Sequence, residues 1–136
     1  MQAYPARAAQ AYLHTHVQSR SPLELVVMLY DGLLRFMGDA GSAIDAGNLP
    51  AKRDGISKAL AVLSELQSTL NMEQGGDVAT SLDALYTYMN GRLLDATMQN
   101  DRAPLDESAR LLRPLREAWA EIAQQDVAPA GVEVRR

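Results

Sequence analysis

Residues 17–36 read V-Q-S-R-S-P-L-E-L-V-V-M-L-Y-D-G-L-L-R-F, a helix start signal followed by a long apolar run. Ser21 and Glu24 stand three residues apart and can each accept a hydrogen bond from the other's backbone N–H, which is the capping box. Pro22 suits the first helical position because its missing N–H would have no partner there. The apolar residues that follow recur at helical spacing over an unusually wide arc. The stretch therefore predicts a helix that buries one face in its own core and offers a second to a partner.

The composition is that of a small acidic protein without disulfides. The chain has 136 residues, no cysteine and a formal net charge of −4. One domain of this length can bury a core without covalent staples. The acidic balance argues against nucleic acid as a partner, since phosphates need a basic surface. No apolar run is long enough to insert in a membrane, and the N-terminus lacks the apolar segment of a signal peptide, so we expect a cytoplasmic protein.

Apolar residues at spacings of three and four predict four helices, over residues 21–46, 50–72, 77–100 and 104–124. Gly47 can take the left-handed conformation that ends the first helix. Gly75 and Gly76 break the chain, after which Asp77 can cap the third helix. Pro114 lies inside the fourth helix, where it removes a backbone hydrogen bond and predicts a kink. Because short loops join the segments, we expect an all-α fold, an antiparallel four-helix bundle.

The predicted core consists of the apolar stripes of these helices. Their members are Leu25, Met28, Leu29, Leu33, Phe36 and Met37, then Ile56, Ala59, Leu60, Leu63, Leu66 and Leu70, then Val78, Leu82, Leu85, Met89, Leu93 and Ala96, and finally Leu105, Ala109, Leu112, Leu115, Trp119 and Ile122. Residues 1–20 precede this bundle as an N-terminal arm or short helix, which we interpret as a mobile cap. The bundle domain spans residues 21–124, and residues 125–136 read as a disordered tail.

No pattern in the sequence indicates catalysis, a cofactor or a metal site. A di-metal centre in a helical bundle needs histidines on the inner helix faces. Both histidines, His14 and His16, fall in the arm, and residues two apart do not share a helix face. Serines such as Ser21 and Ser81 have no histidine placed to activate them. We therefore expect a binding protein and not an enzyme.

Tyr30 and Tyr86 allow two interpretations. In the first, the rings are buried at the edge of the bundle and the hydroxyls stay in water. In the second, the tyrosines line a groove for an incoming helix, beside Met28 and Met89, whose flexible side chains adapt to a partner. The spacing favours the first interpretation by a narrow margin. Gly91, in the middle of the third segment, would permit close approach of a neighbouring helix, either its own or a partner's.

Four motifs follow one another in the order seen in a known family. They are S-P-L-E-L-V-V-M-L-Y-D-G-L-L-R-F at 21–36, L-Q-S-T-L-N-M-E-Q-G-G-D-V at 66–78, L-Y-T-Y-M-N-G-R-L-L at 85–94 and L-L-R-P-L-R-E-A-W at 111–119. Together they resemble the FliS family of flagellar secretion chaperones, over roughly residues 12–122. The resemblance implies a non-enzymatic cytoplasmic chaperone that binds the disordered C-terminal segment of flagellin. Such a chaperone prevents premature polymerisation and assists export by the flagellar type III secretion system, where the export gate is a further partner.

The flagellin segment is expected to fold into apolar grooves of the bundle. Our candidates for this site are Leu25, Met28, Leu29, Tyr30, Leu85, Tyr86, Met89 and Leu93. The resemblance also implies that the arm, through Tyr12 and Val17, covers an apolar groove until flagellin arrives. The alternative function is a structural helical module that self-associates through the same apolar surface. That alternative predicts a mass that rises with concentration and indifference to flagellin, whereas the chaperone predicts a monomer or weak homodimer.

Overall fold

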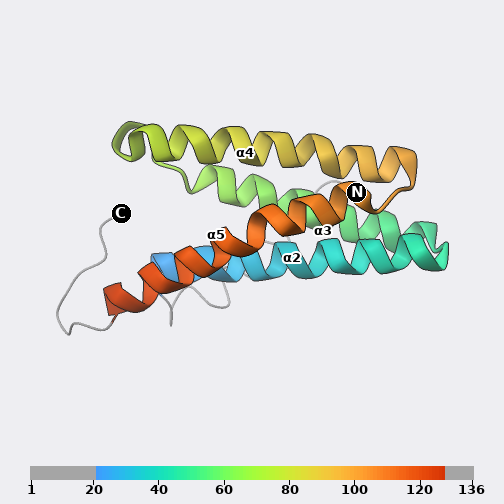
Figure 1. Ribbon diagram of the computed structural model, residues 1–136, viewed down its shortest axis with the longest axis horizontal. Coiled ribbons are helices and arrows are strands. Elements are labelled where there is room, and N and C mark those ends of the chain that lie inside the picture. Colours follow the sequence, from blue (N-terminus) through green and yellow to red (C-terminus); the bar gives the residue numbers. More distant parts are fainter. Residues whose placement is uncertain (1–20, 128–136) are drawn as a thin grey trace.

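The computed structural model describes residues 21–127, which form four helices and no strand (Figure 1). The helices are α2 (Pro22–Ala46), α3 (Leu49–Ser68), α4 (Met72–Gln99) and α5 (Ala103–Val127). Each helix packs against the one before it, and α5 returns to pack against α2, so α2 lies diagonally opposite α4. This arrangement confirms the expected all-α bundle. The proposed cap residues Tyr12 and Val17 lie outside the described residues.

The start of α2 is capped as the sequence predicts. The Ser21 hydroxyl accepts a hydrogen bond from the Glu24 N–H at 3.1 Å, and the Glu24 carboxylate accepts one from the Ser21 N–H at 3.0 Å. Gly47 closes the helix with a φ of 71°. None of the helices that the structure describes is long and apolar enough to cross a lipid bilayer.

The boundary between α3 and α4 differs from the prediction. Helix α3 ends at Ser68, and the Asn71 side chain caps α4 by accepting a hydrogen bond from the Gln74 N–H at 2.9 Å. Helix α4 thus has a first turn before the expected start at Asp77, because Asn71 supplies an earlier cap, and the expected break at Gly75 and Gly76 separates that turn from the rest of the helix. Gly76, with a φ of 54° and a ψ of −132°, still interrupts the helical backbone after its first turn.

Helix α5 follows an oblique path across the bundle. It begins beside the end of α4 and finishes beside the start of α2, well apart from the start of α4 (Figure 1). The helix continues through Pro114 and reaches Val127, three residues beyond the expected end at Gln124. Within the described residues, α4 and α5 thus diverge toward the end of the bundle that holds the start of α2. We call this end the open end.

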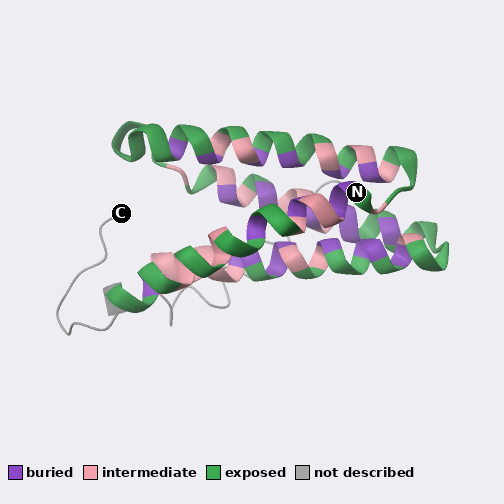
Figure 2. Cartoon of the chain, viewed as in Figure 1, coloured by how far each residue is buried: buried purple, intermediate pink, exposed green. Residues whose placement is uncertain are grey.

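The core runs along the inward faces of all four helices (Figure 2). Two predicted core residues, Val78 and Ile122, are instead 66% and 44% exposed, while their neighbours Ala79 and Ala123 are buried. Both exposed residues lie at the open end, where α4 and α5 have separated. The buried stripe of α4 therefore begins at Ala79, and that of α5 excludes Ile122.

Candidate functional site

The residues predicted to line the groove fall into a buried and a half-buried group. The buried group, with at most 1% of each residue exposed, is Leu29, Tyr30, Tyr86, Met89 and Leu93. The half-buried group is Leu25, Met28 and Leu85. Members of the first group belong to the core of the free chain, so only the second group presents surface to a partner. Which residues touch a partner stays a prediction.

Leu25 and Met28 lie along the edge of α2 that borders α3. They share a helix face with Phe36, because residues 25, 28, 32 and 36 follow one another at steps of three or four. The ammonium group of Lys58 in α3 lies 5.8 Å from the centre of the Phe36 ring. We call Leu25, Met28 and Phe36 the α2–α3 edge. All three are half-buried, and Leu25 and Met28 lie at the open end.

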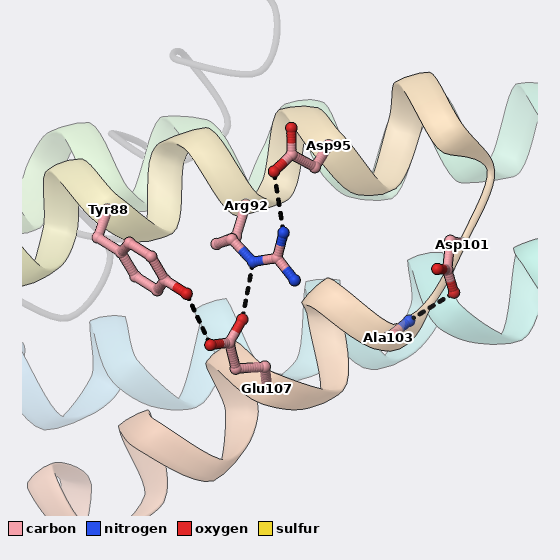
Figure 3. A network of polar contacts seen from close by, with 6 residues as sticks. All are labelled: Tyr88, Arg92, Asp95, Asp101, Ala103 and Glu107. Atoms are coloured by element: carbon pink, nitrogen blue, oxygen red, sulfur yellow. Dashed lines mark hydrogen bonds and ion pairs between the residues drawn. The ribbon is translucent and has the colours of Figure 1, made fainter.

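A polar network ties the middle of α4 to the start of α5 (Figure 3). The Tyr88 hydroxyl and the Arg92 Nε each donate a hydrogen bond of 2.7 Å to the Glu107 carboxylate. Arg92 also donates to Asp95 at 2.9 Å. The hydrogen bond from Tyr88, followed by that from Arg92, lowers the pKa of Glu107. The carboxylate therefore stays ionised and fixes which faces of α4 and α5 meet.

The same faces continue toward the open end as apolar surface. Leu85 precedes Tyr88 by three residues on α4, and Leu111 follows Glu107 by four residues on α5. Leu111 is 40% exposed, and Leu115 and Ile122 extend its face along α5. We call Val78, Leu85, Leu111, Leu115 and Ile122 the α4–α5 edge.

Sequence reasoning missed the contribution of α5 to this surface. It assigned Leu115 and Ile122 to the core stripe, since both have the correct spacing. The available signal was Leu111, a large apolar residue that lies outside that stripe. An unexplained leucine beside a complete stripe indicates a second apolar face.

A polar contact lies in the core beneath the open end. The hydroxyl oxygens of Tyr30 and Tyr86 are 2.6 Å apart, and the Trp119 Nε1–H donates to the Tyr30 hydroxyl at 3.3 Å. The two rings meet edge to face, with centroids 6.4 Å apart. The prediction that these hydroxyls stay in water is wrong, because they are buried and bonded to each other. Burial raises the pKa of both tyrosines, so both remain neutral at physiological pH.

The described residues hold no cluster of side chains suited to binding a metal ion. Residues 21–127 contain neither histidine nor cysteine. In this part of the chain no group of three or more acidic side chains could hold a metal ion. What the described surface offers is apolar contact area.

Comparison with known proteins identifies the family. The profile of the family described as flagellar protein FliS matches residues 5–126. The flagellar secretion chaperone FliS of Salmonella typhimurium is 37% identical over 116 residues, which cover 85% of this chain and 86% of that protein. FliS of Vibrio cholerae is 36% identical over 117 residues, covering 83% and 86%. FliS of Bacillus subtilis is 34% identical over 116 residues, covering 85% and 86%.

These matches agree with the four sequence motifs and with the helical bundle. They extend over most of the chain, so they are not confined to one motif. The shared name describes a chaperone of flagellar export, which is a binding function and not a catalytic one. The chain therefore belongs to the FliS family of flagellar secretion chaperones.

Proposed function

We propose that this chain is a cytoplasmic chaperone for the C-terminal segment of flagellin. It keeps flagellin from polymerising early and assists its delivery to the gate of the flagellar type III secretion system. The observation that supports this proposal is the apolar surface at the open end. There, leucine, isoleucine and valine side chains of the α4–α5 edge stay partly or largely exposed in water.

The layout of this surface suits a long, flexible client. The α2–α3 edge and the α4–α5 edge lie at the same end of the bundle but on different sides of it. One short helix cannot cover both edges, whereas an extended segment can pass from one to the other. A disordered client needs burial on the order of 1,000–3,000 Å² to offset the cost of its own ordering. A wrapping path supplies a larger area than either edge alone.

We assign different roles to the two groups of predicted groove residues. Leu25, Met28 and Leu85 contact the client directly, together with the exposed residues of α5. The buried residues form the core against which these contact residues pack: Leu29, Tyr30, Tyr86, Met89 and Leu93. In this proposal Tyr12 and Val17 of the arm cover part of the same surface in the free chaperone. Deletion of residues 1–16 should then tighten flagellin binding, because an internal competitor lowers the apparent affinity.

Titration calorimetry with the C-terminal segment of the organism's own flagellin tests the proposal. We expect one-to-one binding with a negative heat-capacity change, and no heat from flagellin truncated before that segment. The double variant Leu85→Gln/Ile122→Gln should weaken binding at least tenfold. Leu49→Gln is the matched control, since Leu49 is 43% exposed but lies at the start of α3, at the opposite end of the bundle.

Three results would contradict the proposal. A folded sample that gives no heat with the segment would exclude flagellin as the client. A mass that rises with concentration, unchanged by flagellin and abolished by Leu85→Gln/Ile122→Gln, would instead support the structural module that self-associates through this surface. Equal weakening by Leu49→Gln would show that the open end is not the binding surface.

A further inference from the structure

The hydrogen bonds and ion pairs between α4 and α5 converge on one carboxylate (Figure 3). Among the described residues, Glu107 is the one residue of α5 that forms such contacts with α4, and its partners are Tyr88 and Arg92. The side chains of Arg92 and Glu107 are 30% and 32% exposed, so the pair lies in the seam between the helices and not in open solvent. Asp95 accepts a second hydrogen bond from Arg92 and so holds the guanidinium from its other side. We call Tyr88, Arg92 and Glu107 the clasp.

The clasp lies where the two helices begin to separate. Glu107 stands one turn inside α5, which starts at Ala103, and beyond it α5 leaves α4 on its way to the start of α2 (Figure 1). At the far end of this divergence Val78 and Ile122 are 66% and 44% exposed. From Glu107 to Ile122 the helix rises about 22 Å, so a tilt of about 5° at the clasp would move Ile122 by about 2 Å. The spacing of the helices at the open end is therefore sensitive to their geometry at the clasp.

Beyond the clasp, α4 and α5 follow different neighbours. Arg116 of α5 donates to the carboxylate of Asp31 in α2 at 2.8 and 3.1 Å. The Gln67 amide of α3 donates to the Asp83 carboxylate at 2.9 Å and to the Thr87 hydroxyl of α4 at 3.2 Å. One side of the α4–α5 edge is thus attached to α2 and the other side to α3. The clasp is the place where polar groups tie the two sides directly to each other.

The clasp differs from an isolated ion pair on a protein surface. An isolated pair contributes little, because its two long side chains keep much of their freedom. Here Glu107 accepts two hydrogen bonds, and Arg92 is shared between two carboxylates, so charge-assisted bonds fix the geometry on both helices. A surface whose two sides are already held at one spacing loses less freedom when a partner binds, and its affinity is higher for that reason.

We propose that Arg92 and Glu107 are positioning residues of the client surface: through the clasp they hold α4 and α5 at the spacing at which a client binds across the α4–α5 edge. The identity of the client rests on the proposed function, whereas the spacing of the helices does not. If the clasp is broken, the binding spacing becomes one of several. The apparent affinity then falls in proportion to the population that keeps it.

The absence of cysteine from the chain allows the spacing to be measured with nitroxide labels. Ser81 and Ala118 are exposed, and they lie three residues after Val78 and four residues before Ile122, on the two sides of the α4–α5 edge. In the full-length variant Ser81→Cys/Ala118→Cys, pulsed electron paramagnetic resonance gives the distribution of distances between the labels. We expect a narrow distribution while the clasp is intact.

Charge reversal at Glu107 breaks the clasp in this labelled chain. Glu107→Arg sets a second cation beside Arg92 and should broaden the distribution of distances at least twofold. Asp45→Arg is the matched control, because Asp45 of α2 pairs with Arg102 at the start of α5, at the opposite end of the bundle. The control should leave the distribution unchanged. Glu107→Gln is the milder variant if Glu107→Arg does not fold, and it should change the distribution in the same direction.

Calorimetry with the C-terminal segment of flagellin tests the consequence for binding. Glu107→Arg should weaken binding at least tenfold, and Asp45→Arg less than twofold. The variant Arg92→Cys/Glu107→Cys should bind weakly, and should regain affinity within twofold of the natural chain once a bifunctional maleimide of about the length of the two lost side chains joins the cysteines. The cross-link restores the spacing but not the charges, so recovery separates positioning from direct contact with the client.

An unchanged distribution of label distances in Glu107→Arg and Glu107→Gln would overturn the proposal. Weaker binding that the cross-link does not restore would also overturn it, since Glu107 would then act by touching the client. Equal binding by the natural chain and both Glu107 variants would do so as well, while leaving the proposed function intact. If the natural chain itself gives no heat with flagellin, the proposed function fails, and the label distances alone decide whether the clasp sets the spacing of α4 and α5.

Discussion

The hydroxyl oxygens of Tyr30 and Tyr86 lie 2.6 Å apart, although they belong to α2 and α4, which are diagonal in the bundle. The backbones of these two helices do not pack against each other within the described residues, so only long side chains can join them across the core. Trp119 of α5 adds its N–H to the Tyr30 hydroxyl. One oxygen therefore links three helices at the open end, and a polar group in an apolar core fixes how they fit together.

Replacing each tyrosine by phenylalanine should give unequal losses of stability. Tyr86→Phe removes one hydrogen bond and leaves Tyr30 to accept from Trp119, so we expect a loss of about 1 kcal/mol. Tyr30→Phe removes both hydrogen bonds, leaves the Tyr86 hydroxyl and the Trp119 N–H without this partner, and should cost about 2–3 kcal/mol. The free energy of unfolding in urea, followed by circular dichroism, measures both.

The double variant is the control for this prediction. Phenylalanine at both positions removes two polar groups together, so the combined loss should be smaller than the sum of the single losses. Equal losses from the single variants, or strict additivity, would show that the hydroxyl contact does not couple the helices.

Alkaline pH should destabilise the fold through the same pair. Burial raises the pKa of Tyr30 and of Tyr86 above the ordinary value near 10. Above pH 10 the unfolded chain releases protons that the folded chain retains. The contribution of the two tyrosines to the free energy of unfolding is therefore constant below about pH 10 and falls above it, by about 1.4 kcal/mol per pH unit for each tyrosine.

Urea unfolding at pH 9, 10 and 11 tests this slope. The variant Tyr30→Phe/Tyr86→Phe should lose most of the decrease, since its remaining tyrosines are not in the core pair. If the free energy of unfolding of this variant falls above pH 10 as steeply as that of the natural chain, the two core tyrosines are not the cause of the fall.

Local signals predicted the helices well, and contacts between helices decided what the sequence could not show. The capping box at Ser21 and the turn at Gly47 depend on neighbouring residues only, and both are observed. The first turn of α4, before the break at Gly76, was missed because both Asn71 and Asp77 can cap a helix. The exposure of Val78 and Ile122 depends on the path of α5, which periodicity does not encode.

The sequence predicted which apolar residues belong to the region of the candidate site, but not which of them are exposed. Spacing identifies Leu29, Tyr86 and Leu85 equally as apolar positions, yet only Leu85 reaches the surface. The difference arises from the side of the helix: Leu29 and Tyr86 belong to the core cluster, whereas Leu85 only packs against it from the margin of α4. The hydroxyl pair was missed for a similar reason, because a contact between diagonal helices joins residues 56 positions apart.

Alanine should have opposite effects at two glycines of the bundle. A Cβ at Gly55 would lie 3.1 Å from the backbone N of Ala40 and from the carbonyl oxygen of Phe36, where α3 meets α2. Backbone atoms cannot move aside easily, so Gly55→Ala should cost about 1–3 kcal/mol. Gly38 is exposed, with nothing within 4 Å of its Cβ position, and Gly38→Ala should stabilise by about 0.5–1 kcal/mol. Denaturation curves measure both, and a change of the same sign in both variants would contradict the prediction.

Low pH should remove the contribution of Glu107 to the stability of the fold. Its pKa is lowered by the hydrogen bonds from Tyr88 and Arg92, so its stabilising effect is present above the ordinary carboxyl pKa and is lost as pH falls through the lowered value. Glu107→Gln should thus be less stable than the natural chain at pH 7, with the difference shrinking by pH 3. Glu121→Gln, at an exposed position of the same helix, is the control and should show a smaller difference at either pH. A difference for Glu107→Gln that is independent of pH would indicate a packing effect.

Lys52 lies on α3 but should stabilise the end of α4. Its contribution should exceed that of an ordinary surface lysine. It is only 6% exposed, and its ammonium donates at 3.1 Å both to the carbonyl oxygen of Thr97 and to the side chain of Asn100. The last carbonyls of a helix lack partners within it and carry partial negative charge, so a lysine from α3 satisfies them. Lys52→Met keeps the apolar stem and removes the donor, and should lower the free energy of unfolding by about 1–3 kcal/mol.

Lys58→Met is the matched control for this last prediction. Lys58 also lies on α3, but its ion pair is with Asp54 four residues earlier, at 3.1 Å, and its other contact is with the face of the Phe36 ring, 5.8 Å from the ring centre. Such a pair contributes about 0.3–0.5 kcal/mol, so the control should lose far less stability. Hydrogen exchange adds a local readout, because Lys52→Met should speed exchange at the last turn of α4 before it does so in α2. Uniform acceleration over all four helices would show that Lys52 acts through general packing and not by capping α4.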